Sequence, residues 1–216
     1  MIKFVKISDR NNMHFVRPFF ILNYVYPQAI WRKEKDRNNI YLTFDDGPIP
    51  EITPWILDCL KEKNIKATFF CVGENIQKHP DIFQRILEEG HAVGNHTYNH
   101  LKGWDTDNQL YLDNIAKCNA LTKTSLFRPP YGRAKKSQMK ILSKEYKIIM
   151  WDVLTGDYDH RISPDQCYKN CIDFTRNGSI IVFHDNVKAI DNVKYALPKS
   201  IDTLLARGFQ FKTLSI

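Results

Sequence analysis

The sequence lacks an apolar run long enough to cross a bilayer, and it lacks a convincing leader. Residues 18–26 are apolar, but they fall short of the roughly 20 residues that a membrane-spanning helix needs. This run follows Arg17 and contains no small-residue cleavage site, so it fits a signal peptide poorly. We therefore expect no integral membrane segment. Residues 1–39 are expected to form an N-terminal arm that packs on the main domain or on a partner.

Paired cysteines are missing as well. The five cysteines are an odd number, and no two of them form a Cys-x-x-Cys pair. In a chain of 216 residues, this pattern is typical of reduced and mostly buried thiols rather than of a disulfide framework. The cysteines therefore indicate a reducing compartment, and together with the absent leader they favour a cytoplasmic protein.

A block of basic residues is the third absence. Lys and Arg number 31 against 24 Asp and Glu, a net charge of +7, but the positive residues are scattered. Scattered charge indicates a solvated surface rather than a nucleic-acid-binding track, so we expect no nucleic-acid partner. No linker, repeat or low-complexity tract divides the chain after the arm. With a hydrophobic content of 43%, residues 40–216 are expected to form one domain around one sizeable core.

Short strand-like apolar runs alternate with segments of helical spacing along this domain. Repeated β–α units with nearly continuous apolar strands indicate a parallel sheet covered by helices. Seven strands predict an α/β fold of the distorted, incomplete (β/α)7 TIM-like barrel type, with an open doubly wound sheet as the fallback. The expected strands are residues 40–44, 67–72, 91–95, 126–128, 147–151, 179–183 and 209–214.

Polar side chains that suit a catalytic metal site follow two of these strands. Asp45 and Asp46 come directly after the first strand, and His96 and His100 follow the third. The carboxyl ends of parallel strands share one face of the fold, so these side chains should meet. One Asp and two His give the three protein ligands expected of a catalytic metal site. The other carboxylate is free to act as a base on an activated water, which predicts a metal-dependent hydrolase.

Three more chemistry-bearing residues fall at the same face. Arg128 closes the fourth strand, Asp157 comes a few residues after the fifth, and His184 ends the sixth. Each has an ordinary structural explanation taken alone, such as a loop cap or a rim histidine. Independent segments that deliver metal ligands, acid, base and guanidinium to one face together favour an active site.

The chain from residue 40 onwards resembles the polysaccharide deacetylases of carbohydrate esterase family 4, the NodB-type deacetylases. Five motifs of that family appear in order. The first three are Thr-Phe-Asp-Asp-Gly at 43–47, His-Thr-Tyr-Asn-His at 96–100 and Arg-Pro-Pro-Tyr-Gly at 128–132. The fourth, usually Asp-x-x-Asp-Trp, is represented by residues 154–158, and the fifth, Leu-x-His, by residues 182–184. The first three together are highly specific, and the last two gain weight from their order.

The resemblance implies a metal-dependent hydrolase that removes N-acetyl groups from a peptidoglycan- or chitin-like glycan and releases acetate. One divalent ion, zinc first, with cobalt, nickel or manganese as alternatives, would be held by Asp46, His96 and His100. Asp45 would be the general base, oriented by Arg128. The resemblance also implies that His184 is the acid and that Asp157 keeps it protonated. The backbone N–H of Tyr131 would bind the oxyanion, and Tyr158 and Val182 would be the walls of the acyl pocket.

Two residues depart from the fourth motif of the family. Leu154 stands where the motif has its first Asp, and Tyr158 stands where it has Trp. Asp157, the member that tunes the catalytic His in this family, is retained, so the chemistry is expected to survive with an altered acyl pocket. Asp152 is a further hypothesis as a displaced substitute for the missing carboxylate.

Other functional classes explain the residues less well. A zinc protease needs Glu after the first His of its motif, where this chain has Thr97. A non-haem iron oxygenase shares the two His and one carboxylate, but it has no need of Asp45 or of an Asp157–His184 pair. A non-catalytic carbohydrate-binding module would fit if Asp45 or His184 were missing. The alternative that stays open is a related hydrolase acting on a formamide, a cyclic amide or a small N-acetyl metabolite. The sequence leaves the oligomeric state open.

Overall fold

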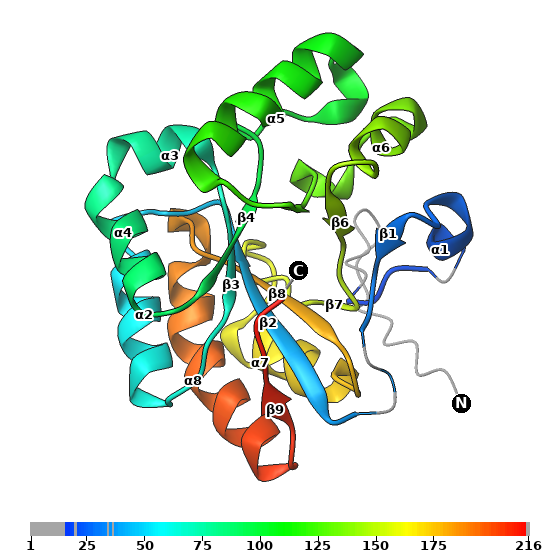
Figure 1. Cartoon of the computed structure of the whole chain (residues 1–216). Coiled ribbons are helices and arrows are strands. Elements are labelled where there is room, and N and C mark those ends of the chain that lie inside the picture. Colours follow the sequence, from blue (N-terminus) through cyan, green and yellow to red (C-terminus); the bar gives the residue numbers. More distant parts are fainter. Residues whose placement is uncertain (1–15, 20, 34, 36, 215–216) are drawn as a thin grey trace.

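The structure is a computed structural model of the chain, and it describes residues 16–19, 21–33, 35 and 37–214. The first 15 residues of the expected arm therefore lie outside the described residues. The strands curl around a common centre, and most of the helices lie along the outside of this curl (Figure 1).

Nine strands form among the described residues, and every pairing between them is parallel. Their order in the sheet is β1-β6-β5-β4-β3-β2-β8-β7, with β9 beside β2. Their bounds are β1 Ala29–Ile30, β2 Asn39–Asp45, β3 Thr68–Cys71, β4 Ala92–Asn95, β5 Leu126–Phe127, β6 Lys147–Ile149, β7 Val153–Leu154, β8 Ile180–His184 and β9 Gln210–Phe211.

Helices fill most of the connections between these strands, as the alternating sequence pattern predicts. The α-helices are α1 Leu22–Val25, α2 Thr53–Glu62, α3 Gly73–Lys78, α4 Pro80–Glu88, α5 Asn108–Thr122, α6 Lys136–Leu142, α7 Pro164–Phe174 and α8 Ile190–Ala206. Short 3-10 turns are η1 Gly103–Asp105, η2 Pro130–Gly132 and η3 Val187–Ala189.

The expected incomplete barrel is confirmed, and each of the seven expected strands is present within or near its predicted bounds. The last one is shorter than predicted, because only Gln210 and Phe211 pair with β2. Two strands, β1 and β7, were not predicted. Each is a two-residue strand that forms beside a strand from another part of the chain, so neighbouring residues alone do not reveal it.

The sequence of β2 explains how the barrel buries both faces of its sheet. Ile40, Leu42 and Phe44 belong to the large apolar cluster that lies under the helices. The alternate residues Tyr41 and Thr43 face the other way, because successive side chains of a strand point to opposite faces. Tyr41 belongs to a separate cluster on that inner side. Asp45, next in the same row, therefore ends β2 on the inside of the barrel.

The described part of the N-terminal segment connects the two edges of the curled sheet. Leu154 of β7 donates a backbone hydrogen bond to Val16, 2.7 Å away. Further along, Ala29 and Ile30 form β1 at the opposite edge, beside β6. Arg32 then forms an isolated antiparallel bridge with Ser179, just before β8. The segment thus spans the opening that an incomplete barrel leaves.

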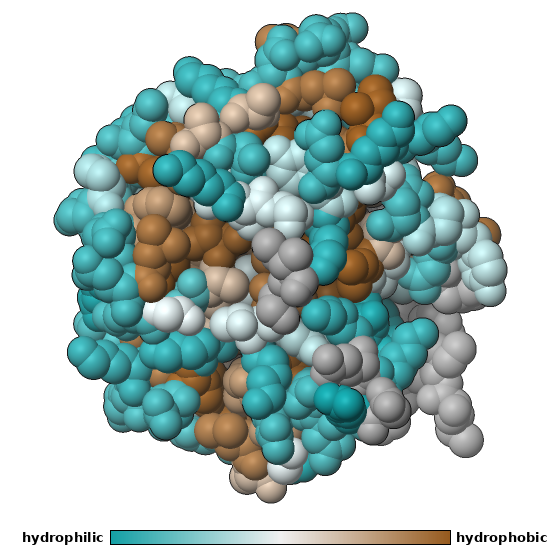
Figure 2. All heavy atoms as spheres, viewed as in Figure 1, coloured by the Kyte–Doolittle hydropathy of each residue, from teal (hydrophilic) through white to brown (hydrophobic). Residues whose placement is uncertain are grey.

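The outer surface carries the expected mixture of side chains. Hydrophilic residues cover most of the face in Figure 2, and hydrophobic residues appear between them in small groups. All five cysteines are buried free thiols, as the sequence predicts. Among the described residues, no helix combines the length and the apolar character that crossing a membrane requires.

Candidate active site

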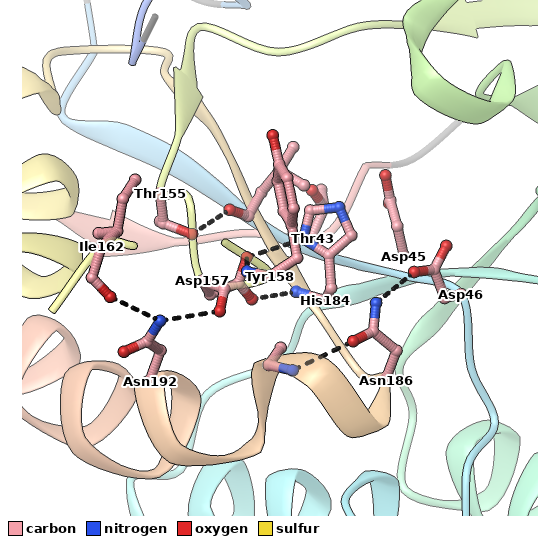
Figure 3. A network of polar contacts seen from close by, with 12 residues as sticks. Thr43, Asp45, Asp46, Thr155, Asp157, Tyr158, Ile162, His184, Asn186 and Asn192 are labelled. Carbon is pink, nitrogen blue, oxygen red and sulfur yellow. Dashed lines mark hydrogen bonds and ion pairs between the residues drawn. The ribbon is translucent and has the colours of Figure 1, made fainter. Parts of the chain in front are cut away.

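Two strands from distant parts of the chain place a carboxylate and an imidazole side by side. Asp45 at the end of β2 is in register with His184 at the end of β8. Because the strands are parallel, the loops that follow them leave the barrel at the same end. Figure 3 shows Asp45, Asp46 and His184 gathered there, as the positions of these residues after their strands predict.

Asp46, His96 and His100 come together next to this pair. Their ligand atoms lie within 4.8 Å of one another. Asp46 Oδ1 is 3.1 Å from His100 Nε2 and 3.6 Å from His96 Nε2. Asp46 and His100 have positive φ angles of 91° and 58°, which non-glycine residues rarely adopt. The surrounding fold holds these angles, and this strained backbone aims the side chains at a common point.

The chemistry of these three side chains fits a divalent cation. Asp46 Oδ1 is buried and accepts no hydrogen bond from a described residue, although two imidazole rings face it. His96 Nδ1 lies 2.8 Å from the Arg128 carbonyl, which fixes a proton on Nδ1 and leaves Nε2 as a lone-pair donor. Burial lowers the pKa of His96 to about 4, so its ring is neutral, the form that binds metals.

The charge of the Asp46 carboxylate also suits a metal ligand. Burial by itself would raise the pKa of Asp46. The contact with the His100 imidazole, followed by the positive charge of His184, outweighs that effect, so the pKa of Asp46 is lowered. A carboxylate that keeps its charge and two imidazole nitrogens form a donor set that zinc and similar divalent ions accept.

Two asparagines that sequence analysis missed hold Asp46 in place. Asn186 Nδ2 donates to Asp46 Oδ2 at 2.6 Å, and Asn75 Nδ2 donates to the Asp46 carbonyl at 2.7 Å. Asn186 is itself fixed, because its Oδ1 accepts a hydrogen bond from the Ala189 N–H at η3. Asn75 follows β3 and Asn186 follows β8, at the same end of the barrel. Their position just after a strand is the sequence feature that could have identified them.

Replacing Asn186 by Ala is expected to weaken divalent-metal affinity by roughly 10- to 100-fold, the usual effect of removing a partner of a metal ligand. The expected cause is a loss of orientation at Asp46. Titration of the metal-free protein with Zn²⁺ by calorimetry measures this effect without any activity assay. The control His100→Ala should remove the site altogether. An unchanged dissociation constant in Asn186→Ala would contradict the orienting role.

Asp45 is held by a fully buried arginine. Arg128 Nη1 lies 2.6 Å from Asp45 Oδ1 and 2.8 Å from Thr43 Oγ1. The other guanidinium nitrogens donate to the carbonyls of Ile149 and Met150. Burial lowers the pKa of Arg128, whereas the Asp45 charge raises it. A buried guanidinium with these partners is fixed in place, so it orients the Asp45 carboxylate beside the metal ligands.

His184 is paired with Asp157 rather than with Asp45 or Asp46. His184 Nδ1 lies 2.8 Å from Asp157 Oδ1, and the His184 backbone N–H donates to Asp157 Oδ2 at 2.5 Å. Asn192 of α8 donates to the Asp157 carbonyl, which anchors this loop (Figure 3). Burial lowers the pKa of His184, but the charge and hydrogen bond of Asp157, with help from Asp46 and Asp45, raise it to about 9.

Three further predicted residues line this end of the barrel. The ring of Tyr131 meets His100 edge to face, with 4.7 Å between centroids, and the ring of Tyr158 meets His184 in the same way at 4.8 Å. Val182 is buried inside the barrel on the same face of β8 as His184, two residues earlier. Tyr131 has a φ of 59°, and its neighbour Gly132 leaves no room for a side chain beside Trp151.

The hypothesis that Asp152 substitutes for the missing carboxylate of the fourth motif is wrong. Asp152 accepts hydrogen bonds from Ser179 and Arg176 at 2.7 and 2.6 Å. Ser179 precedes β8, whereas His184 ends it, so roughly 16 Å of extended strand separates the two positions. Asp152 thus lies at the opposite end of the barrel and is far from His184.

Asp185 is a third residue that sequence analysis missed. Its fully buried carboxylate accepts hydrogen bonds from the Gly47 N–H at 2.9 Å and from Thr53 Oγ1 at 2.7 Å. Burial raises the pKa of Asp185 to about 8, against the opposing effect of those two donors. A Cβ at Gly47 would lie 1.8 Å from Asp185 Oδ2, so only glycine fits there. This packing fixes the turn that carries Asp45 and Asp46.

Comparison with known proteins now identifies the family. The sequence model of the family described as polysaccharide deacetylase matches residues 32–147, more than half of the chain and the part that contains the first three motifs. The chain belongs to the polysaccharide deacetylase family. The resemblance inferred from the five motifs is confirmed. Polysaccharide deacetylases of this kind depend on a metal ion, in agreement with the Asp–His–His cluster.

Relatives within the polysaccharide deacetylase family align with more than four fifths of the chain. A peptidoglycan-N-acetylglucosamine deacetylase of Bacillus cereus is 37% identical over 187 residues, which are 83% of this chain and 68% of the relative. One from Listeria monocytogenes is 34% identical over 188 residues, 84% of this chain but 39% of the relative. The chain thus spans well under half of the Listeria protein.

A solved structure agrees with the sequence comparison. The crystal structure of a peptidoglycan N-acetylglucosamine deacetylase in complex with 4-naphthalen-1-yl-N-oxidanyl-benzamide superposes with a TM-score of 0.83 at 35% identity. The alignment covers 91% of this chain and 95% of that one. The incomplete barrel of the polysaccharide deacetylases is therefore the fold of this protein.

Proposed function

We propose that this protein removes N-acetyl groups from an amino-sugar glycan, with peptidoglycan as the first candidate, and releases acetate and a free amine. The observation that carries the proposal is the placement of two separate polar pairs, Asp45 with Arg128 and His184 with Asp157, beside one three-ligand cluster. The names of the relatives support N-acetylglucosamine as the sugar.

The cation proposed for the cluster of Asp46, His96 and His100 is zinc. Two imidazole nitrogens and one carboxylate oxygen are borderline donors that zinc prefers, and three protein ligands leave positions for water and substrate. When bound, the ion lowers the pKa of water and polarises the amide carbonyl. Cobalt, nickel and manganese accept the same donors and are the alternatives.

Asp45 takes the proton from the attacking water in this mechanism. Its carboxylate is the one that the cluster does not use, and Arg128 fixes its orientation from the opposite side. A general base must lie within hydrogen-bonding reach of its proton, and Asp45 is adjacent in sequence to a metal ligand. Arg128 is itself too deeply buried to touch the substrate, so its role is to position Asp45.

His184 gives a proton to the departing amine. Its pKa of about 9 means that the ring is protonated at neutral pH, and Asp157 holds the proton-bearing Nδ1 so that Nε2 is left to face the substrate. The backbone N–H of Tyr131 is the proposed donor to the oxyanion. Val182 and Tyr158 are the proposed walls of a small acyl pocket beside His184.

Acetate release across a panel of amides tests the proposal. Peptidoglycan and N-acetylated chitooligosaccharides should release acetate, and the release should stop when a chelator is added and return with Zn²⁺. Acetyl and formyl amides should be cleaved and longer acyl groups rejected, because the pocket is small. Failure of every N-acetylated sugar beside turnover of a cyclic amide would overturn the substrate assignment and favour the alternative hydrolase.

A further inference from the structure

A cleft lined by aromatic side chains lies next to the candidate metal cluster. It has a volume of about 200 Å³, and we call it the aromatic cleft. One wall comes from the N-terminal segment and the other from the loops that carry the third motif. The residues that matter for its chemistry are Tyr26, Trp31, Trp104, Tyr131, Arg133 and Trp151.

The aromatic cleft is continuous with the metal cluster through one side chain. Tyr131 lines the cleft, and its ring also packs against the metal ligand His100 at 4.7 Å. Gly132 packs so closely on Trp151 that an added Cβ would lie 2.5 Å from the indole ring. The floor of the cleft and the third motif are thus one packed unit, and a chain extending from the reacting group past Tyr131 would enter the cleft.

The lining of the aromatic cleft suits a sugar ring. Tyr131 and Trp104 are 60% and 48% exposed, so their rings are accessible to a ligand in the cleft. Trp104 is held by a hydrogen bond from Nε1 to the Ala134 carbonyl at 2.9 Å, so its ring is fixed although it is exposed. The electron-rich faces of such rings attract the weakly positive C–H groups of a pyranose.

Arg133 adds a positive charge to the same cleft. Its guanidinium lies 5.3 Å from the centre of the Trp104 ring, and it forms no ion pair with any described residue. Arg133 is exposed, and its guanidinium lies over the Trp104 ring at the edge of the cleft. It is placed to meet a carboxylate carried by a sugar that stacks on Trp104.

We propose that the aromatic cleft binds the sugar adjacent to the reacting one in a glycan chain, and that Arg133 pairs with a carboxylate on that chain. The N-terminal segment, through Tyr26 and Trp31, then serves as one wall of the substrate site. This inference rests on the proposed function, because it takes the occupant to be the same glycan. It adds which part of the molecule recognises the chain beyond the reacting sugar.

Binding to an inactivated, zinc-loaded protein tests the cleft separately from catalysis. Asp45→Asn serves as the background, and calorimetry measures the affinity for tetra-N-acetylchitotetraose. Trp104→Ala in this background should weaken binding roughly 2- to 10-fold, the range expected for loss of an aromatic contact. Trp104→Phe should restore most of it. Tyr195→Ala on α8 removes a 37% exposed ring outside the cleft and should leave the affinity unchanged.

A second ligand, one that carries carboxylates, is needed to test the role of the Arg133 charge. A muramic-acid-containing tetrasaccharide with free lactyl carboxylates should bind Arg133→Gln about 2- to 5-fold more weakly than the parent, because partly exposed ion pairs are weak. The uncharged tetrasaccharide should bind both equally. If Arg133→Gln bound the muramic-acid-containing tetrasaccharide as tightly as the parent does, the role of Arg133 would be overturned.

The cleft itself would be overturned if Trp104→Ala bound tetra-N-acetylchitotetraose as tightly as the parent, or if the parent did not bind it. That result would leave the proposed function standing wherever acetate is still released from glycans by the active protein. If no glycan released acetate but Trp104→Ala still weakened binding, the proposed reaction would fall and the sugar-binding cleft would remain.

Discussion

Asp45→Asn is expected to keep its bound metal while deacetylation slows by roughly 10²- to 10⁴-fold, the usual cost of removing a general base. The structure separates the two adjacent carboxylates for this purpose. Asp46 Oδ1 faces two imidazole rings, whereas Asp45 Oδ1 faces the guanidinium of Arg128 at 2.6 Å. An amide at position 45 therefore leaves the cluster intact but has no lone pair basic enough to accept a proton from water.

Elemental analysis measures the bound metal, and kcat for acetate release measures the loss of activity. Asp46→Asn is the matched control, and it should lose the metal. Breaking a buried ion pair is also destabilising, by about 3–5 kcal/mol where one partner stays charged, so thermal unfolding must be followed for Asp45→Asn. If Asp45→Asn lost the metal and Asp46→Asn kept it, the two roles would be reversed.

His184→Ala should lower kcat by a similar factor of roughly 10²- to 10⁴-fold, because the departing amine loses its proton donor. Metal content should not change, since His184 is not part of the cluster. A His184→Ala protein that deacetylates at the parent rate would disprove the acid role. Asp157→Asn is the milder companion, because it keeps the imidazole and removes only the charge that acts on it.

The pH dependence gives the sign of the Asp157 effect. His184 acts in its protonated form, so activity should fall as pH rises through the pKa of His184, which is about 9. Asp157 raises that pKa by its charge and hydrogen bond, whereas burial lowers it. In Asp157→Asn the burial effect remains and the raising effect of Asp157 is lost, so the alkaline limb should move to lower pH. An alkaline limb at the parent's position would show that another group titrates there.

The sequence alone predicted seven of the nine described strands and a set of candidate site residues, because both have local signatures. An apolar strand such as 40–44 followed by Asp45 and Asp46 is visible within a few residues. His96 and His100 are likewise four residues apart. Parallel topology then brings the ends of such strands to one face, so their convergence followed from the pattern of the elements.

Other features depended on contacts between distant residues, and no local pattern encodes those. β1 and β7 are two-residue strands that exist only beside β6 and β8. The predicted role of Asp152 was wrong because its hydrogen-bond partners Arg176 and Ser179 are more than 20 residues away in the chain. The supports of Asp46 were missed for the same reason, since Asn186 is 140 residues from it.

The sequence by itself therefore determined the barrel, the family and a set of candidate site residues, because hydrophobic periodicity and contiguous motifs are properties of neighbouring residues. Only the tertiary structure decided that Asn75 and Asn186 hold Asp46 in place and that Asp152 pairs with Arg176 and Ser179. It also decided that Asp157 raises the pKa of His184 to about 9 and that the N-terminal segment walls an aromatic cleft. Those facts depend on the distances between segments far apart in the chain and on how deeply the side chains are buried. Distance sets the Coulomb energies and burial sets the desolvation energies, and together they set the pKa values of the site.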